Sequence, residues 1–282
     1  MKECQQTMRK PDSISVARLM AFNKFSVGNF FEVLRELRSK HQFHSKDIYN
    51  IDDTGFSTVP TKSPKVISAR GNQRVIKATS AERGTTITCV CAMNAIGNFF
   101  PFLIFPRMRM NPSFIYGAPN GSTEVARETG WITAQIFLKY LQHFKLRSFY
   151  YLTTTALIQL GVDFYRAHNI FLLVFPPHTS HKLQPLDVAF YSPLTAAYSQ
   201  GCDNFMVNHP GYAIAIKTVA GIFGKAYLKT AIIRIAINEP FNYSIFDDED
   251  FEPSHPTDTL VQDSQPKDSP AVIPDPSRDN SA

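Results

Sequence analysis

The apolar run over residues 170–175, with the polar block behind it, constrains the fold more than any other stretch. The run is short, rich in β-branched and aromatic residues, and stopped by Pro176-Pro177, which predicts a buried strand. The polar block ends in a lone acid, Asp187, at the start of a helix-like segment over 188–199. Two interpretations of this acid are open. It is either a carboxylate aimed into a site from the end of a strand, or an N-cap that starts the helix.

Charge is distributed unevenly along the chain. Residues 246–282 hold ten acids and two bases, a net charge of −8, while the whole chain carries +5, so the first 245 residues carry +13. The positive charge of the first 245 residues suggests a polyanionic partner. An equally weighted alternative is that this charge only keeps the protein soluble. The acidic stretch is also rich in Pro, Ser and Asp and has little to bury, so we expect 246–282 to be a disordered tail.

Membrane and metal signals are weak. No apolar run approaches the roughly 20 residues of a membrane span, and no secretory signal opens the sequence. Four cysteines lack metal-ligand spacing, which favours a reduced intracellular compartment.

Other segments predict an α/β protein. Helices are expected over 30–41 and 133–145, and strands over 85–94 and 99–106 with a hairpin turn at 95–98. Residues 188–238 should be helical, with an interruption near 208–211.

Several blocks, in this order, carry a family resemblance. They are Ile48-Tyr-Asn-Ile-Asp-Asp-Thr-Gly55, Thr79-Ser-Ala-Glu-Arg-Gly84, Phe105-Pro-Arg107, Gly130-Trp131 ahead of a helix, and Pro176-Pro-His-Thr-Ser-His-Lys-Leu-Gln-Pro-Leu-Asp187. Over roughly residues 9–240 the chain resembles the pogo/Tigger-type transposases, DDE superfamily endonucleases that include jerky-like and centromere protein B-like host proteins. The resemblance implies a ribonuclease-H-like mixed sheet flanked by helices, Mg²⁺ as cofactor, DNA as partner and a nuclear location. It implies neither a membrane nor a small-molecule substrate, and the oligomeric state stays open.

The resemblance also divides the chain. Residues 1–45 would be a remnant of a DNA-binding helix-turn-helix region with its connector. Residues 46–240 would be the endonuclease-like domain, followed by the acidic tail over 246–282.

Two candidate catalytic acids follow from the matching blocks. Asp52 corresponds to the first acid of the family, at the end of a strand expected over 47–51 and broken by Thr54-Gly55. Asp187 corresponds to the third acid. The same two carboxylates are the candidate Mg²⁺ ligands, because Mg²⁺ is held by one or two carboxylates plus water and phosphate oxygens. Asp53 stands where the family usually has Glu and is given no catalytic role.

The second acid of the family is missing. The family typically has Leu-Leu-Asp-Asn-His at a strand end, where this chain reads Phe149-Tyr-Tyr-Leu-Thr-Thr-Thr155. Codons can be chosen for residues 152–159 whose neighbouring frame reads Leu-Asp-Asn-His-Ser-Thr-His-Ser, so we hypothesise a local frameshift. The lost aspartate would fall at the Leu152/Thr153 boundary, 34 or 35 residues before Asp187.

Basic residues and histidines supply the candidate nucleic-acid contacts. A basic hairpin with few acids is expected over 61–83. It could bind a DNA backbone, and a solvent-exposed flap without that role is an equally weighted alternative. In the block before Asp187, two histidines on a loop are a weak zinc signal. The resemblance implies that they orient the acid or contact phosphate, and Gln184 is a further candidate contact. The residues predicted to contact nucleic acid are Lys62, Lys65, Arg70, Arg74, Lys77, Arg83, Arg107, His178, His181 and Lys182.

The leading hypothesis is a transposase-derived, DNA-binding DDE endonuclease-like domain that is catalytically inactive because its second acid is absent. One alternative is an active Mg²⁺-dependent transposase whose deduced sequence contains an error. The other is a domesticated scaffold or interaction protein that keeps only the fold.

Overall fold

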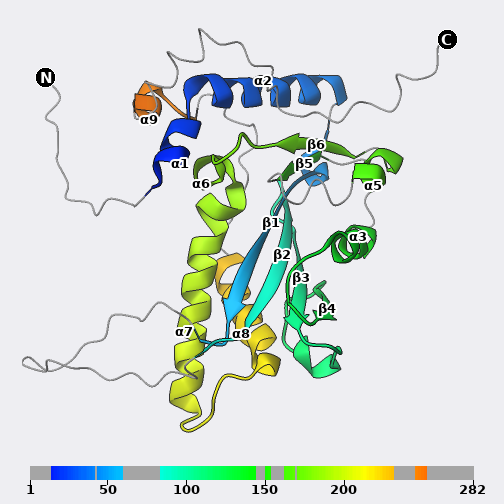
Figure 1. Ribbon diagram of the computed structural model, residues 1–282, viewed down its shortest axis with the longest axis vertical. Coiled ribbons are helices and arrows are strands. Elements are labelled where there is room, and N and C mark those ends of the chain that lie inside the picture. The colour runs from blue at the N-terminus through cyan, green and yellow to red at the C-terminus, as the bar shows by residue number, and fades with distance from the viewer. Residues whose placement is uncertain are drawn as a thin grey trace, which may run out of the picture.

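A six-stranded mixed sheet organises the protein, seen here in a computed structural model that describes residues 14–41, 43–59, 83–143, 150–153, 162–168, 170–231 and 245–252. The strand order is β4-β3-β2-β1-β5-β6 (Figure 1). The strands are β1 Ile48–Ser57, β2 Thr86–Asn94, β3 Phe99–Pro106, β4 Thr123–Arg127, β5 Tyr150–Thr153 and β6 Phe171–Val174.

The pairing directions give the fold class. β1, β2 and β3 are successive antiparallel neighbours, β5 lies parallel to β1, and β6 lies parallel to β5. An antiparallel meander that continues into parallel strands on the other side of its first strand is the ribonuclease-H-like arrangement. The expected fold is therefore confirmed, with β4 added in parallel at the edge beside β3.

Helices cover both faces of the sheet (Figure 1). They are α1 Val16–Ala21, α2 Lys24–His41, α3 Ala134–His143, α5 Val162–Ala167, α6 Ser180–Leu183, the π-helix η3 Leu186–Tyr191, α7 Ser192–Asn208, α8 Ile216–Ala231 and α9 Asp248–Phe251. Short 3-10 turns occupy Ser45–Asp47 and Pro112–Phe114.

Alternation along the central strands builds the two main cores. On β2, Cys89 and Cys91 face the core under α7 and α8, whereas Val90 and Ala92 face the core under α3 and α5. Residues that alternate with period two point to opposite faces, and both faces of β2 are covered, so the strand is apolar throughout. The sheet interior is thus rigid on both sides of β1, the strand that carries the first candidate acid.

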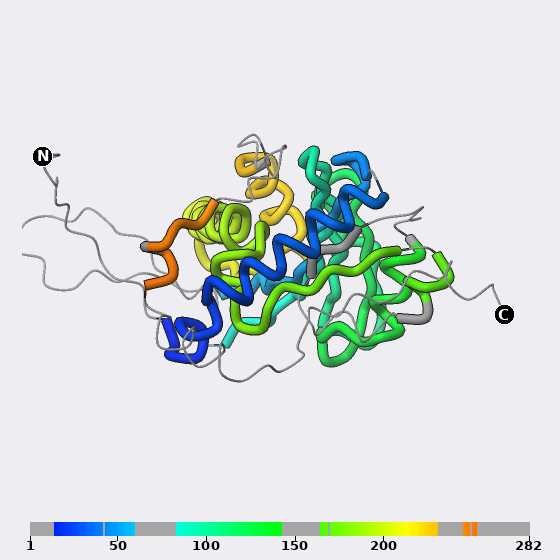
Figure 2. Tube along the Cα trace, turned by 90° about the horizontal axis from the view of Figure 1, so that it is seen from above, coloured from blue at the N-terminus to red at the C-terminus, as the bar shows by residue number. Residues whose placement is uncertain are grey.

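A third core lies under α2, which crosses the end of the sheet alongside β6 (Figure 2). Val27, Leu34 and Leu37 of α2 are buried there, and the Phe30 ring packs 5.2 Å from that of Phe175, just after β6. Helix α2 therefore shares a core with the sheet, whatever the ancestry proposed for residues 1–45.

Most expected elements are present. The strands over 85–94, 99–106 and 170–175 and the helices over 30–41 and 133–145 appear within a few residues of the expected bounds. The helical stretch after 188 breaks at Asn208 as expected, and residues 232–238 lie outside the described part. Strand β4 was not expected.

One boundary was wrong at the candidate site. The strand expected over 47–51 does not end at Thr54-Gly55, because β1 continues to Ser57 and pairs residue by residue with β2. A full antiparallel ladder satisfies the backbone of Gly55, and a Cβ there would lie 2.9 Å from a Thr86 methyl carbon. Asp52 consequently lies within the strand, opposite Cys91 of β2 and one residue beyond the last pairing of β1 with β5, Ile51 with Thr153.

The prediction of a disordered acidic tail over 246–282 was wrong for the first residues of that segment. Instead of a disordered segment from residue 246, α9 packs against the N-terminal helices, with Phe251 buried and Phe246 partly buried in the α2 core. Two aromatic residues among the acids give this segment something to bury. Residues 253–282 lie outside the described part of the chain.

Candidate active site

The segments that carry the two candidate acids meet in the fold although they are far apart in the sequence. Asn50, just before Asp52, is hydrogen-bonded to Gln184, just before Asp187, across a separation of 134 residues. Asp52 projects from the middle of β1, and Asp187 lies in the first turn of η3. The Leu186 backbone N–H, next to Asp187, donates to Asn50 Oδ1 at 3.1 Å, and the Asp187 charge contributes to raising the pKa of Asp52. The N-cap interpretation of Asp187 is wrong, since Pro185 holds the N-cap position and no side chain caps this helix.

A buried polar clamp fixes this approach. Asn50 donates from Nδ2 to Gln184 Oε1 at 3.1 Å and accepts at Oδ1 from the Leu186 backbone N–H at 3.1 Å. Gln184 in turn donates from Nε2 to the Ile51 carbonyl oxygen at 3.3 Å. Both amides are 0% exposed, so no water competes for these bonds. The clamp ties the segment that carries Asp187 directly to the strand that carries Asp52.

Gln184 is therefore not available to nucleic acid, contrary to the expectation from its position in an exposed-looking polar loop. Its backbone N–H bonds to the Ser180 carbonyl oxygen, and its side chain is fully enclosed. The polar type of Asn50 and Gln184 hid their role, because sequence alone does not tell a buried amide from a surface one. Two amides placed two and three residues before the acids were the only available signal.

The local electrostatics oppose two ionised carboxylates. Burial, and next the Asp187 charge, raise the pKa of Asp52 to about 7. Burial also raises the pKa of Asp53 and of Asp187, and at Asp187 the Arg18 guanidinium acts in the opposite direction. Arg18, which the sequence did not single out, thus brings a positive charge from α1 to the acid pair. A bound cation would relieve the same repulsion.

Asp52 and Asp187 fit one divalent ion better than two. Carboxylate oxygens suit Mg²⁺, which completes its octahedron with water and phosphate oxygens. Within the described residues, no group of three or more His, Cys, Asp and Glu side chains is arranged to hold a metal. A two-ion site needs further ligands that this pair does not supply.

The end of β5 reaches the same place. In the parallel register Leu152 lies beside Asn50 and Thr153 beside Ile51, the residue before Asp52. The boundary at which the sequence predicts a lost acid is therefore the point of β5 nearest to the first acid. Residues 154–161, including the rest of the altered motif, lie outside the described part of the chain.

The two histidines of the block differ in exposure, and His181 is half-buried. His178 is exposed and adopts a positive φ of 61°, a conformation that non-glycine residues visit uncommonly. The Nδ1 of His181 lies 3.1 Å from the His178 carbonyl oxygen, and burial lowers the pKa of His181. Lys182 is exposed and forms an ion pair with Asp250 at 3.1 Å. His181 and Lys182 belong to α6, His178 lies two residues before it, and the three precede Asp187 by nine, six and five residues.

The other candidate contacts are not brought to the acids. Arg83 precedes β2 and Arg107 follows β3, so both exposed side chains lie toward the end of the sheet away from Asp52. The remaining predicted contacts lie outside the described residues: Lys62, Lys65, Arg70, Arg74 and Lys77.

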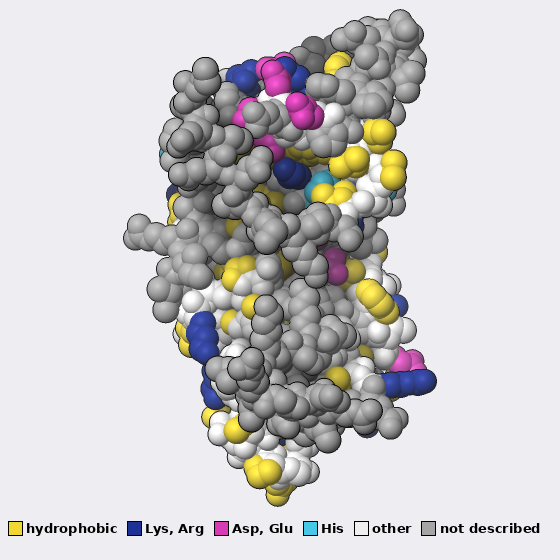
Figure 3. All heavy atoms as spheres, turned by 90° about the vertical axis from the view of Figure 1, so that its left-hand side faces the viewer, with side chains coloured by type: hydrophobic (Ala, Val, Ile, Leu, Met, Phe, Trp, Pro, Cys, Tyr) yellow, Lys and Arg dark blue, Asp and Glu magenta, His cyan; other side chains and the backbone are white. Residues whose placement is uncertain are grey.

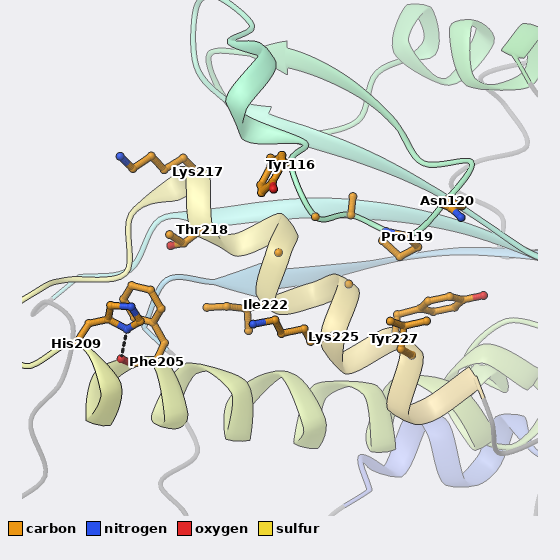
Figure 4. A pocket seen from close by; sticks show the side chains of 15 residues that line it. Tyr116, Pro119, Asn120, Phe205, His209, Lys217, Thr218, Ile222, Lys225 and Tyr227 are labelled. Atoms are coloured by element: carbon orange, nitrogen blue, oxygen red, sulfur yellow. Dashed lines mark hydrogen bonds between the residues drawn. The ribbon is translucent and has the colours of Figure 1, made fainter.

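A pocket of about 700 Å³ lies elsewhere, between the segment after β3 and helices α7 and α8 (Figure 4). Tyr116, Lys217 and Lys225 line it, and no acid does. The candidate chemistry belongs to the acid pair rather than to this pocket.

Comparison with known proteins finds a family that the central segment of the chain matches. Residues 86–214 match the family model described as DDE superfamily endonuclease. The resemblance drawn from the sequence blocks is thereby confirmed at the level of the superfamily domain. The pogo/Tigger subtype is compatible with this match and stays a prediction.

One curated relative is the MFS-type transporter clz9 of Cochliobolus lunatus. It is 26% identical over 192 residues, which cover 61% of this chain and 20% of the relative. The chain thus spans about a fifth of the protein that it matches.

Among the described residues, none of the helices combines the length and the apolar character that crossing a bilayer requires.

Similar solved structures include three complexes of the Mos1 transposase. The paired-end complex with the left transposon end has 12% identity and a TM-score of 0.43 and covers 84% of this chain and 68% of that one. The Mos1 mariner paired-end complexes with Mn and with Mg have 13% and 14% identity, each with a TM-score of 0.43 and 82% of this chain covered, against 65% and 68% of theirs. At these scores the fold assignment rests on the strand order and not on the likeness.

Proposed function

Because residues 86–214 match the DDE superfamily endonucleases, we propose that this chain is a transposase-derived domain that binds DNA in the nucleus and does not cut it. The observation that carries the proposal is the composition of the acid site. The segments of Asp52 and Asp187 are hydrogen-bonded to each other, while the sequence at the end of β5, which pairs with β1 as far as Ile51, reads Leu152-Thr153 and contains no carboxylate.

The missing acid removes a defined part of the chemistry. In two-metal phosphoryl transfer, paired ions about 3.5–4 Å apart activate the nucleophile and stabilise the leaving oxygen. Asp52 and Asp187 would bind one Mg²⁺, and Asn50 with Gln184 would keep the distance between the two carboxylates fixed. A neutral threonine cannot bridge two cations as a carboxylate does. The site would therefore orient a phosphate without completing its cleavage.

DNA binding is supported by charge and by the contacts near the acids. The first 245 residues carry +13, and α6, which contains His181 and Lys182, lies a few residues before Asp187. Affinity built on phosphate contacts falls steeply with salt, because each contact releases condensed counterions. We expect binding to duplex DNA that weakens as salt rises and is little affected by sequence, since phosphate contacts carry no sequence information.

A nicking assay on supercoiled plasmid tests the proposal. The native chain should leave the plasmid intact in Mg²⁺ or Mn²⁺ while shifting labelled duplex DNA in a salt-dependent way. A chain whose residues 152–159 are replaced by Leu-Asp-Asn-His-Ser-Thr-His-Ser should gain metal-dependent nicking, and the same replacement with Asn for its Asp should not. Cutting by the native chain would overturn the proposed inactivity, and absence of DNA binding at low salt would favour the scaffold alternative.

The second candidate function is an active Mg²⁺-dependent transposase whose deduced sequence is in error. The register of β5 favours it, since the predicted position of the lost acid pairs with Asn50 and Ile51, the two residues before Asp52. The nucleotides that encode residues 145–163 decide between the two. An Asp-Asn-His reading in a neighbouring frame, joined in the transcript, would establish the active enzyme, and a transcript that encodes the three threonines would exclude it.

A further inference from the structure

The acidic segment Phe246–Phe251 lies on the surface that leads to the acid pair. It contacts the turn between α1 and α2 and the α6 segment that precedes Asp187 (Figures 1 and 2). The contacts join residues more than 200 positions apart, such as Lys24 and Asp248. The segment is therefore folded back onto the body of the protein.

Three rings hold the segment in place, and we call Phe22, Phe246 and Phe251 the aromatic corner. Phe22 stacks on Phe251 with ring centroids 5.1 Å apart and meets Phe246 edge-on at 5.0 Å. Phe22 and Phe251 are 4% and 6% exposed. Aromatic burial of this kind supplies most of the docking free energy, since exposed ion pairs contribute little.

Two ion pairs flank the aromatic corner. Lys24 Nζ lies 2.6 Å from an Asp248 carboxylate oxygen, and Lys182 Nζ lies 3.1 Å from an Asp250 oxygen. Acidic and basic side chains lie side by side over α9 and the beginning of α2 at the upper end of Figure 3. The segment thus presents its carboxylates to the same lysines that a phosphate backbone would need.

The contact between Asp250 and Lys182 lies close in the sequence to the candidate acid Asp187. Lys182 lies five residues before Asp187, and its ammonium also stands 5.5 Å from the Phe22 ring centroid. The Phe22 ring is 6.2 Å from that of His181, and the Arg18 charge acts on both His181 and Asp187. The aromatic corner therefore contacts α6, and α6 leads directly into the segment that carries Asp187.

We infer that Phe246–Phe251 is an intramolecular competitor of nucleic acid, docked through the aromatic corner so that Asp248 and Asp250 occupy Lys24 and Lys182 in place of phosphates. The inference rests on the proposed DNA binding. A chain with this segment docked binds DNA more weakly than one with the segment released, in proportion to the fraction that is open.

Two sets of variants separate docking from net charge. Phe246→Ala alters no charge and loosens the aromatic corner, so it should tighten binding to a short random-sequence duplex by about threefold at low salt. The pair Asp248→Asn with Asp250→Asn should tighten it by about fivefold. The matched control, Asp263→Asn with Asp268→Asn, removes the same charge from the tail outside the described residues and should tighten it by less than about twofold.

Hydrogen exchange supplies a second measurement on the native chain. Amides of residues 246–252 should exchange faster when DNA is added, whereas those of β2 should not change. Equal tightening by the control pair and the Asp248/Asp250 pair, or unchanged exchange in the presence of bound DNA, overturns the inference alone. Failure of every variant to bind DNA overturns the proposed function, and the competition with it.

Discussion

The acid pair and the aromatic corner are neighbours on one surface but are held in different ways. Asp52 and Asp187 are fixed by the fully buried amides of Asn50 and Gln184. The aromatic corner is held by rings at the edge of a core and by exposed ion pairs, and its C-terminal member belongs to a helix of 4 residues. The first arrangement is rigid only if every partner is present, whereas the second can open without unfolding the sheet.

The largest effect is expected from breaking the buried hydrogen bonds between Asn50 and the segment that carries Asp187. Asn50→Ala removes both bonds of the clamp to the Asp187 segment and leaves the Leu186 N–H and a Gln184 oxygen buried without partners. We expect a loss of about 2–4 kcal/mol in the free energy of unfolding. Asn204→Ala, which deletes an exposed amide that accepts from Gln200, should change it by no more than about 0.5 kcal/mol. Denaturant titration of both variants measures the difference, and equal losses would refute the clamp.

A pH titration tests the repulsion inside the acid pair. Between its ordinary pKa of 3.8 and the raised value of about 7, folded Asp52 keeps a proton that the unfolded chain releases. The unfolding free energy therefore falls as pH rises through this window and levels off above it. From pH 5 to 8 the native chain should lose about 3 kcal/mol more than Asp52→Asn, because pH 5 lies about two units below the raised pKa of about 7 and each unit contributes about 1.4 kcal/mol.

Mg²⁺ should reduce that loss, because a cation favours the charged carboxylates. Asp250→Asn is the matched control with the opposite sign, since Lys182 lowers the pKa of Asp250 and its contribution is lost as pH falls. An identical pH profile for the native chain and Asp52→Asn would show that the pair is open to water.

A smaller effect on the free energy of unfolding is expected from changes in the docked segment Phe246–Phe251. Phe251→Ala should lower the free energy of unfolding by only about 1 kcal/mol, because the segment can undock before the rest unfolds and the cost is limited to its docking. Hydrogen exchange in residues 246–252 should rise strongly at the same time. A loss near the ~3–5 kcal/mol of a core Phe→Ala change would instead make α9 part of the main cooperative unit.

The smallest effect concerns a single exposed ion pair. Asp248→Asn should change the unfolding free energy by less than about 0.5 kcal/mol, because the Lys24 and Asp248 side chains are 68% and 82% exposed. High salt should remove even this difference, and a larger salt-independent loss would indicate a buried role for Asp248.

Much of the fold was predictable because its elements carry strong local patterns. The apolar run before Pro176-Pro177 and the hairpin around 95–98 are examples, and the sequence blocks supplied the pairing of Asp52 with Asp187. Features that depend on distant partners were not predictable. The extension of β1 past Gly55 requires β2, and the enclosure of Gln184 requires Asn50, 134 residues away. The docking of Phe251 likewise requires Phe22.

The π-helical turn at Leu186–Tyr191 makes chain length as important as residue identity near Asp187. A wider turn accommodates one residue more than an α-helix over the same distance. Deleting a single residue there would allow a continuous α-helix into α7 with its apolar positions still matched to the core. The carboxylate would then rotate by about 100° around the helix axis, away from β1. Relatives that differ only by a gap at this turn would keep every motif letter and still lose the acid pair.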